Sequence, residues 1–299
     1  VAKSHIRVGT FQLARLSKQE DDIENLLEYS ITRLNPELTN KKDRYLKFFI
    51  KIVEDQINLI INWQRVGFIH GVMNTDNMSL SGETIDYGPC AFLDEYDPKK
   101  VFSSIDINGR YAFINQPKIV IWNLARLAET FLHLIDKDEE FAIKKIEVIL
   151  KDYEKKFNDL WLIMMKNKIG INQNHEKDKE LINDLLNLMH VFKLDYTNTF
   201  IKIHENNIDE FDFMKNWNYK YKERKKLNKN KINTNNYNPK IIPRNHLIEK
   251  TLNESEKNNF KNLNKLIKYL VNPYCESVPE EYTKEPNNEE KVYQTFCGT

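Results

Sequence analysis

The part of the sequence that decides the fold reads HGVMNTDNMS at residues 70–79 and TIDYGP at residues 84–89. It follows an apolar helical pattern at residues 40–66, which ends at Gly67, a residue type that commonly terminates helices. Residues 68–97 contain three of the eight glycines of the chain, with Asn, Asp, Thr and Ser between them. We therefore expect loops that join short strands, and irregular segments of this kind often carry the chemistry of a protein.

Two features of this stretch match the signature of protein kinases, which is a helix, the loop His-Arg-Asp-x-x-x-x-Asn and then Asp-Phe-Gly. His70 and Asn77 are seven positions apart, as in the kinase loop, and Asp86 precedes an aromatic residue and a glycine. Asn77 and Asp86 offer hard oxygen ligands, which suit Mg²⁺ and leave coordination positions for phosphate oxygens and water. The pattern predicts a kinase-like lobe with a magnesium and nucleotide site.

The loop departs from the kinase signature at the catalytic base. Val72 stands where a kinase has its catalytic Asp, and a valine side chain cannot accept a proton. The nearest carboxylate is that of Asp76, next to Asn77. A hydroxyl activated from Asp76 need not attack the same phosphorus as in a kinase. The residues alone also leave open that these Asp and Asn side chains only shape turns.

Composition narrows the class of protein. The 299 residues include 45 basic and 44 acidic ones, and the net charge of +1 argues against a general nucleic-acid surface. No run of about 18 apolar residues is present, so we expect no membrane span. The cysteines, Cys90, Cys275 and Cys297, are too few and too widely spaced to indicate a zinc site or a disulfide framework. Cys297 is either a redox switch or a free thiol.

Helical periodicity continues along most of the chain, and we expect further helices at residues 20–34, 117–134, 136–166, 177–190, 195–203 and 245–270. Trp122 and Phe131 are predicted to be core residues. The Lys- and Asn-rich residues 215–238 favour a loop or a mobile helix end. We expect three parts: a catalytic core at 1–135, a helical extension of the same lobe at 136–271, and a loosely ordered tail at 272–299 that carries Cys297.

Several strings along the chain, together with the loop motif, resemble those of the selenoprotein O (SelO/YdiU) family. They include SHIRVGTF at residues 4–11, GRY at 109–111, DYTNTF at 195–200 and CGT at 297–299. The resemblance implies a protein-kinase-like α+β fold, of which this chain is the mainly α-helical C-lobe with short strands around the catalytic loop. The glycine-rich loop of an N-lobe is not visible, so we expect the chain to begin within a longer protein whose N-lobe is missing here.

The resemblance also implies a protein adenylyltransferase, in a family long counted as pseudokinases, that binds ATP in a flipped orientation and moves AMP to Ser, Thr or Tyr hydroxyls of proteins. Asp76 would accept the proton, Asn77 and Asp86 would bind Mg²⁺ (or Mn²⁺), and Arg7 and Asp86 would contact the nucleotide. The expected partners are ATP and protein substrates, without nucleic acid or membrane, and the protein would be a monomer. It would be cytoplasmic in a bacterium and mitochondrial in a eukaryote. A conventional kinase-type phosphotransferase and a non-catalytic binding module remain the alternatives.

Overall fold

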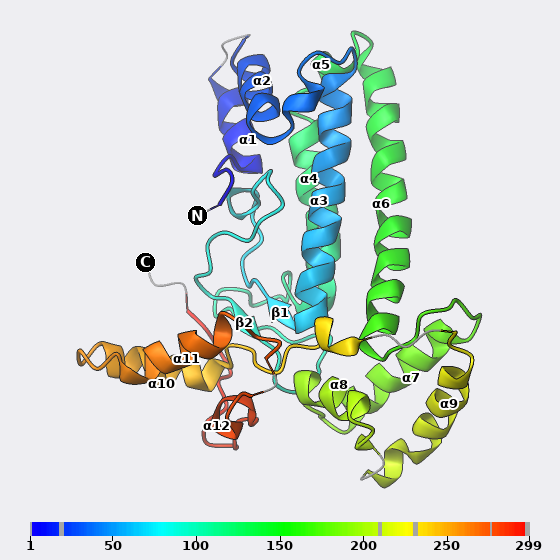
Figure 1. The fold of residues 1–299 in the computed structure, drawn as a ribbon. Helices are drawn as coiled ribbons and strands as arrows, with labels where there is room; N and C mark the ends of the chain where they lie inside the picture. Colours follow the sequence, from blue (N-terminus) through cyan, green and yellow to red (C-terminus); the bar gives the residue numbers. More distant parts are fainter. Residues whose placement is uncertain (1, 18–20, 209–210, 230–232, 276, 297–299) are drawn as a thin grey trace.

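The computed structural model describes residues 2–17, 21–208, 211–229, 233–275 and 277–296, and it is mainly helical. In the upper part of Figure 1, α3, α4 and α6 stand side by side with shorter helices at their upper end, and a second helical part lies beneath them. The first part contains α1 (Val8–Leu16), α2 (Asp22–Leu34), α3 (Arg44–Val66), α4 (Gln116–Ala128), α5 (Leu132–Ile135) and α6 (Glu139–Lys168). The second contains α7 (Asp178–Val191), α8 (Tyr196–His204), α9 (Lys215–Lys226), α10 (Asn245–Ser255), α11 (Lys261–Leu270) and α12 (Glu280–Thr283).

Helix α3 is the central element, and its formation follows from its apolar spacing. Phe48, Ile52 and Ile60 recur on one face and are almost completely buried, where they pack into a core shared with α4 and α6. The helix ends at Gly67, whose φ of 75° lies in the left-handed region that glycine adopts without strain. The predicted helix at residues 40–66 is confirmed, with its start four residues later.

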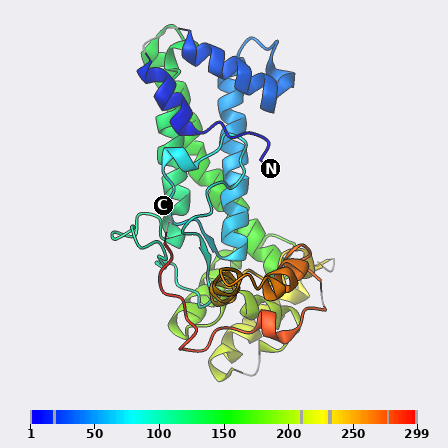
Figure 2. The same cartoon turned by 90° about the vertical axis from the view of Figure 1, so that its left-hand side faces the viewer.

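Two short strands flank the glycine-containing segment, as predicted. β1 (Phe68–Ile69) and β2 (Ala91–Phe92) pair antiparallel, with Phe68 opposite Phe92 and Ile69 opposite Ala91. The pairing brings the two ends of residues 70–90 together, so this segment forms one long loop beside the long helices. In Figure 1 this segment, the first residues and the end of the described chain lie on the left, which is the side that faces the viewer in Figure 2.

The C-terminal helices are joined to the segment after β2 by a buried ion-pair cluster. Arg244, 1% exposed, donates to Asp94 Oδ1 and to Asp195 Oδ2, each at 2.8 Å, and to the carbonyl oxygen of Thr283. Further along, Thr295 forms a parallel bridge with Ser103. The segment after β2 is therefore held by α8, α10 and the C-terminal residues together.

Three sequence-based predictions need correction. Residues 215–226 form the regular helix α9 rather than a loop or a mobile helix end, because Trp217 and Tyr221 lie one turn apart and are buried. Trp122 is 43% exposed, not a core residue, and the guanidinium groups of Arg110 and Arg126 both lie over its ring. The helical region at 245–270 consists of two helices, α10 and α11.

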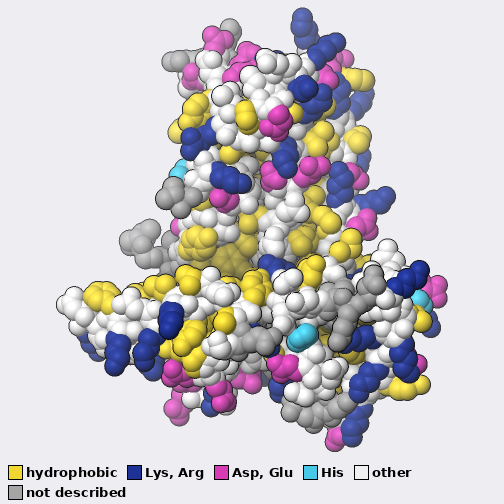
Figure 3. Space-filling view, viewed as in Figure 1, with side chains coloured by type: hydrophobic (Ala, Val, Ile, Leu, Met, Phe, Trp, Pro, Cys, Tyr) yellow, Lys and Arg dark blue, Asp and Glu magenta, His cyan; other side chains and the backbone are white. Residues whose placement is uncertain are grey.

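Other sequence-based predictions are not tested by these features. The kinase-like fold class, the division of the chain near residues 135 and 271, and the missing N-lobe stay predictions. Cys297 lies outside the described residues. Within the described ranges, no helix is both long and apolar enough to cross a membrane. On the face seen in Figure 3, basic and acidic side chains are interspersed, in keeping with the near-zero net charge.

Candidate active site

His70 is the structural centre of the loop that the sequence singles out. Its backbone N–H donates to Gln116 Oε1 at 3.0 Å, its Nε2 lies 2.8 Å from the carbonyl oxygen of Ile85, and its Nδ1 lies 3.4 Å from the backbone nitrogen of Val72. Burial lowers the pKa of His70, because the effect of burial outweighs the hydrogen bonds and the charge of Asp86, which raise the pKa. A neutral ring that donates from Nε2 and accepts at Nδ1 satisfies these contacts. His70 thus joins the loop at 70–78 to the residue before Asp86.

Asp76 lies in a short 3-10 helix, η2 (Thr75–Asn77), and is exposed. It lies against the first turn of α1, where a Cβ atom added to Gly9 would be only 2.0 Å from Asp76 Oδ1. Two backbone hydrogen bonds hold the segments together, from Val8 N to the Met78 carbonyl and from Leu80 N to the Ile6 carbonyl, both 3.0 Å. The close approach of α1 to the carboxylate therefore requires a glycine at position 9.

Asn77 and Asp86 present oxygen atoms that could bind a metal ion. The Asn77 amide nitrogen donates to the Val72 carbonyl at 3.1 Å, and its Oδ1 has no hydrogen-bond partner among the described residues. Asp86 is exposed and has a φ of 55°, an uncommon value for a residue with a side chain. Both residues are held next to His70. Asn77 bonds to Val72, whose backbone nitrogen lies near His70 Nδ1, and Asp86 follows Ile85, whose carbonyl oxygen lies near His70 Nε2.

This donor set fits a hard cation that also binds phosphate and water. An amide oxygen and a carboxylate are ligand types that Mg²⁺ accepts, and Mg²⁺ usually keeps several non-protein ligands. No cluster of three or more His, Cys, Asp or Glu side chains suited to a metal occurs in the part of the chain that the structure describes. A metal held by Asn77 and Asp86 would therefore need further ligands, such as phosphate oxygens or water.

Arg7 reaches the same region from α1. It is the N-cap residue of that helix, is partly buried, and its backbone N–H donates to Thr10 Oγ1 at 3.1 Å. Arg7 also forms a backbone bridge with Ser79, two residues after Asn77. The structure thus brings Arg7, Asp76 and Asn77 together through the contact between α1 and the loop, and it connects Asp86 to them through His70.

Three polar residues support the loop, a role that was not predicted for them from the sequence. Gln56 Nε2 donates to the Ser79 carbonyl at 2.7 Å, Asn123 Nδ2 to the Met73 carbonyl at 3.1 Å, and Tyr111 OH to Asn74 Oδ1 at 2.6 Å. Gln56 and Asn123 are buried. A signal for Gln56 was available, because an amide within an apolar helical stripe needs a hydrogen-bond partner.

Comparison with known proteins identifies the family. A family model described as "Protein adenylyltransferase SelO" matches residues 1–271. The chain belongs to the SelO family. It is 43% identical to the Protein nucleotidyltransferase YdiU of Bacillus cereus (strain ATCC 10987 / NRS 248) and 45% identical to that of Pelagibacter ubique (strain HTCC1062). Each alignment covers 100% of this chain and 64% of the relative. This SelO-family chain thus spans less than two thirds of the length of those relatives.

Proposed function

We propose that this protein is a nucleotidyltransferase that moves AMP from ATP to Ser, Thr or Tyr hydroxyls of protein substrates. The observation that carries the proposal is the position of the Asp76 carboxylate, exposed in the loop and held against the start of α1 beside Arg7. Val72, the position of the kinase base, is 7% exposed and has no proton-accepting group. The family description and the names of the relatives support the same reaction class.

In the proposed reaction, the substrate hydroxyl attacks the α-phosphorus of ATP and Asp76 accepts its proton. The bond from the hydroxyl oxygen to the α-phosphorus forms, the bond from that phosphorus to the bridging oxygen breaks, and pyrophosphate leaves. Asn77 and Asp86 would hold Mg²⁺ (or Mn²⁺), which neutralises charge on the triphosphate. Asp86 would also contact the nucleotide.

Arg7 is assigned to the phosphates in this proposal. A guanidinium fork matches phosphate oxygens, and Arg7 directly precedes the N-terminus of α1, an end of a helix that favours anions. The proposal includes a protein-kinase-like fold whose other lobe completes the ATP site in a flipped orientation. It also includes a monomeric protein in the cytoplasm of a bacterium, in line with the bacterial relatives.

The test uses the protein in its full natural form, incubated with protein substrate, Mg²⁺ and ATP labelled at either the α- or the γ-phosphate. We expect label on protein from the α-position only. Asp76→Asn should reduce the transfer by about 10²- to 10⁴-fold, the usual contribution of a general base. Asp159→Asn, at an exposed carboxylate on α6, is the matched control and should have no effect.

Other outcomes would favour the alternatives. Transfer from the γ-position would indicate a conventional kinase-type phosphotransferase. Absence of transfer from both positions would favour a non-catalytic binding module. Full activity in Asp76→Asn would refute the assigned base while leaving the reaction class intact.

A further inference from the structure

The segment between β2 and α4 presents two exposed apolar side chains on one turn. Ile105 is 62% exposed and Ile107 is 91% exposed. The residue between them, Asp106, is buried and accepts hydrogen bonds from the backbone nitrogens of Arg110 and Tyr111, each at 2.8 Å. Because Asp106 turns inward to close this turn, both isoleucines remain on its outer surface.

The turn is held firmly on both sides. Gly109 has a φ of 65°, and its carbonyl oxygen accepts a hydrogen bond from Asn115 Nδ2 at 2.8 Å. On the other side, the backbone nitrogen of Ser104 donates to the carbonyl oxygen of Thr295 at 3.0 Å. A surface that is already fixed loses little conformational freedom when a partner binds. Exposed apolar side chains on such a supported turn are typical of an interaction surface.

An exposed cation lies on the same turn. The guanidinium group of Arg110 is 4.9 Å from the ring centroid of Trp122 and 5.8 Å from that of Tyr111. The rings orient the guanidinium group without neutralising its charge. Arg126, which also lies over the Trp122 ring, pairs with Glu129, whereas Arg110 forms no ion pair with the residues that the structure describes. Arg110 therefore offers an oriented positive charge to an acidic partner.

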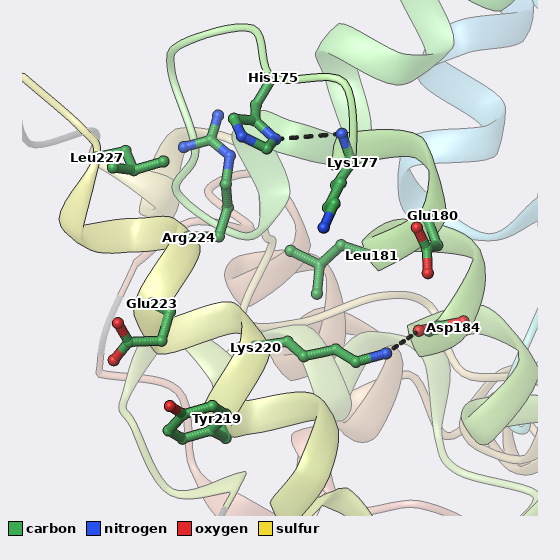
Figure 4. Close-up of a pocket in the computed structure, with 10 residues that line it drawn as sticks. All are labelled: His175, Lys177, Glu180, Leu181, Asp184, Tyr219, Lys220, Glu223, Arg224 and Leu227. Carbon is green, nitrogen blue, oxygen red and sulfur yellow. Dashed lines mark hydrogen bonds and ion pairs between the residues drawn. The ribbon is translucent and has the colours of Figure 1, made fainter.

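Charges elsewhere on the surface are matched within the chain. A cavity of about 360 Å³ between α7 and α9 illustrates this (Figure 4). Lys220 in its lining lies 3.0 Å from the carboxylate of Asp184, and Arg224 donates to Asp178 at 2.6 Å. These two cations already have acidic partners, unlike Arg110, so the turn at 105–110 is the stronger candidate for charge recognition.

The turn is connected directly to the proposed catalytic loop. Tyr111 OH donates to Asn74 Oδ1 at 2.6 Å, and Asn74 precedes Asp76 by two residues. The α4 residue that follows Trp122 donates to a carbonyl oxygen of the same loop at 3.1 Å. Both aromatic residues next to Arg110 thus adjoin this loop. A substrate hydroxyl that approaches Asp76 therefore brings its neighbouring residues close to Arg110.

We propose that Ile105, Ile107, Arg110 and Trp122 form a docking surface for the protein substrate, which selects segments with an acidic and an apolar residue near the hydroxyl that receives AMP. The acidic side chain accepts hydrogen bonds from the guanidinium group of Arg110. The apolar side chain covers Ile105 and Ile107, which removes apolar surface from water. This inference rests on the proposed AMP transfer and adds the class of protein segment that the site accepts.

Peptide acceptors test the docking surface, with the protein in its full natural form, Mg²⁺ and ATP labelled at the α-phosphate. Each peptide pool has a central Ser, Thr or Tyr, one flanking position fixed as Asp, Lys, Leu or Ser, and mixed residues elsewhere. We expect at least one flanking position at which Asp is preferred over Lys by about fivefold or more. At another position, Leu should be preferred over Ser.

Variants locate the two preferences. Arg110→Glu should reverse the charge preference so that Lys is favoured at the same position, while Lys155→Glu, at an exposed residue of α6, changes the net charge equally and should leave it intact. Arg110→Gln should remove the preference without reversing it, and it keeps the test decisive if Arg110→Glu does not fold. Ile107→Ser should raise KM for the Leu-containing peptides about threefold or more at unchanged kcat. Val148→Ser, at an exposed apolar residue of α6, is its control.

The outcomes distinguish this inference from the proposed function. Equal transfer to the Asp and Lys pools at every position would refute the docking surface and leave AMP transfer intact. An active Arg110→Glu or Arg110→Gln that keeps the preference for Asp would do the same, as would transfer to whole proteins but to none of the peptides. Absence of α-label transfer to every acceptor, protein or peptide, would refute the proposed function and this inference with it.

Discussion

Gly9→Ala tests the contact between α1 and the proposed catalytic base. The new Cβ atom would lie 2.0 Å from Asp76 Oδ1 and 3.3 Å from the Asp76 Cα atom. Real Cβ atoms essentially never approach another atom closer than 3.0 Å. The carboxylate must therefore move by about 1 Å, and a displacement of that size can reduce catalysis by about 10²-fold.

Gly9→Ala should change the free energy of unfolding only slightly, and it can stabilise the fold even though it lowers AMP transfer. Gly9 lies in α1, and replacing a helical glycine by alanine stabilises a helix by about 1 kcal/mol. Because Asp76 is exposed and has no ion pair within the described ranges, its side chain can turn away at little cost. We expect AMP transfer to fall about 10²-fold while the free energy of unfolding changes by about 1 kcal/mol or less.

Initial rates of α-label transfer and urea unfolding curves, measured on the same preparations, separate the two effects. Leu13→Ala is the matched control, because this residue lies on the same helix and is 70% exposed. Wild-type transfer in Gly9→Ala would refute the assignment of Asp76, since no arrangement of that carboxylate survives the substitution unchanged. A parallel loss of folding and transfer would show that the contact serves stability instead.

Three further predictions concern the residues around the loop. Asp86→Gly should abolish transfer yet leave stability unchanged or raise it by about 1 kcal/mol, because glycine adopts a φ of 55° without strain; thermal unfolding and the transfer assay check this, and a destabilised protein would contradict it. Because the pKa of His70 is lowered in the folded protein, the unfolded chain binds more protons at acidic pH. The contribution of neutral His70 to the free energy of unfolding is therefore fully present above about pH 6.5 and is lost as the pH falls below that value. His70→Gln should flatten the decline in the free energy of unfolding between about pH 7 and about pH 5, and an identical decline would contradict a buried, neutral His70. Arg244→Met should cost about 3–5 kcal/mol in urea unfolding, since Asp94 and Asp195 would stay buried without their partner, and a loss below about 1 kcal/mol would show that the cluster adds little.

The sequence was most informative where structure depends on local spacing. The apolar period of α3, the glycine at its end and the loop between β1 and β2 could all be predicted, because helices and turns are determined largely by residues within a few positions. His70, Asp76, Asn77 and Asp86 could be found by the same means, since they lie within 17 consecutive positions, whereas Arg7 was expected only from the family resemblance.

What could not be predicted depends on contacts between distant parts of the chain. Gly9 and Asp76 are 67 positions apart, and no local pattern indicates that one must be small to admit the other. Helix α9 was missed because composition outweighed the spacing of Trp217 and Tyr221 in the interpretation. Trp122 is 43% exposed, and of the two arginines that lie over its ring, Arg110 comes from a different segment and could not be predicted to meet it.

The loop separates the groups that hold it in place from the groups that would act in catalysis. Buried neutral side chains, namely Gln56, His70 and Asn123, bind its backbone carbonyl groups. Asp76 and Asp86 are exposed and form no ion pair or side-chain hydrogen bond with the described residues. Buried carboxylates are normally paired, as Asp195 is with Arg244, whereas the exposed Asp76 and Asp86 stay unpaired within the described residues and are free for the roles proposed for them. This separation is also why substitutions of Asp76 and Asp86 can report on chemistry without unfolding the chain.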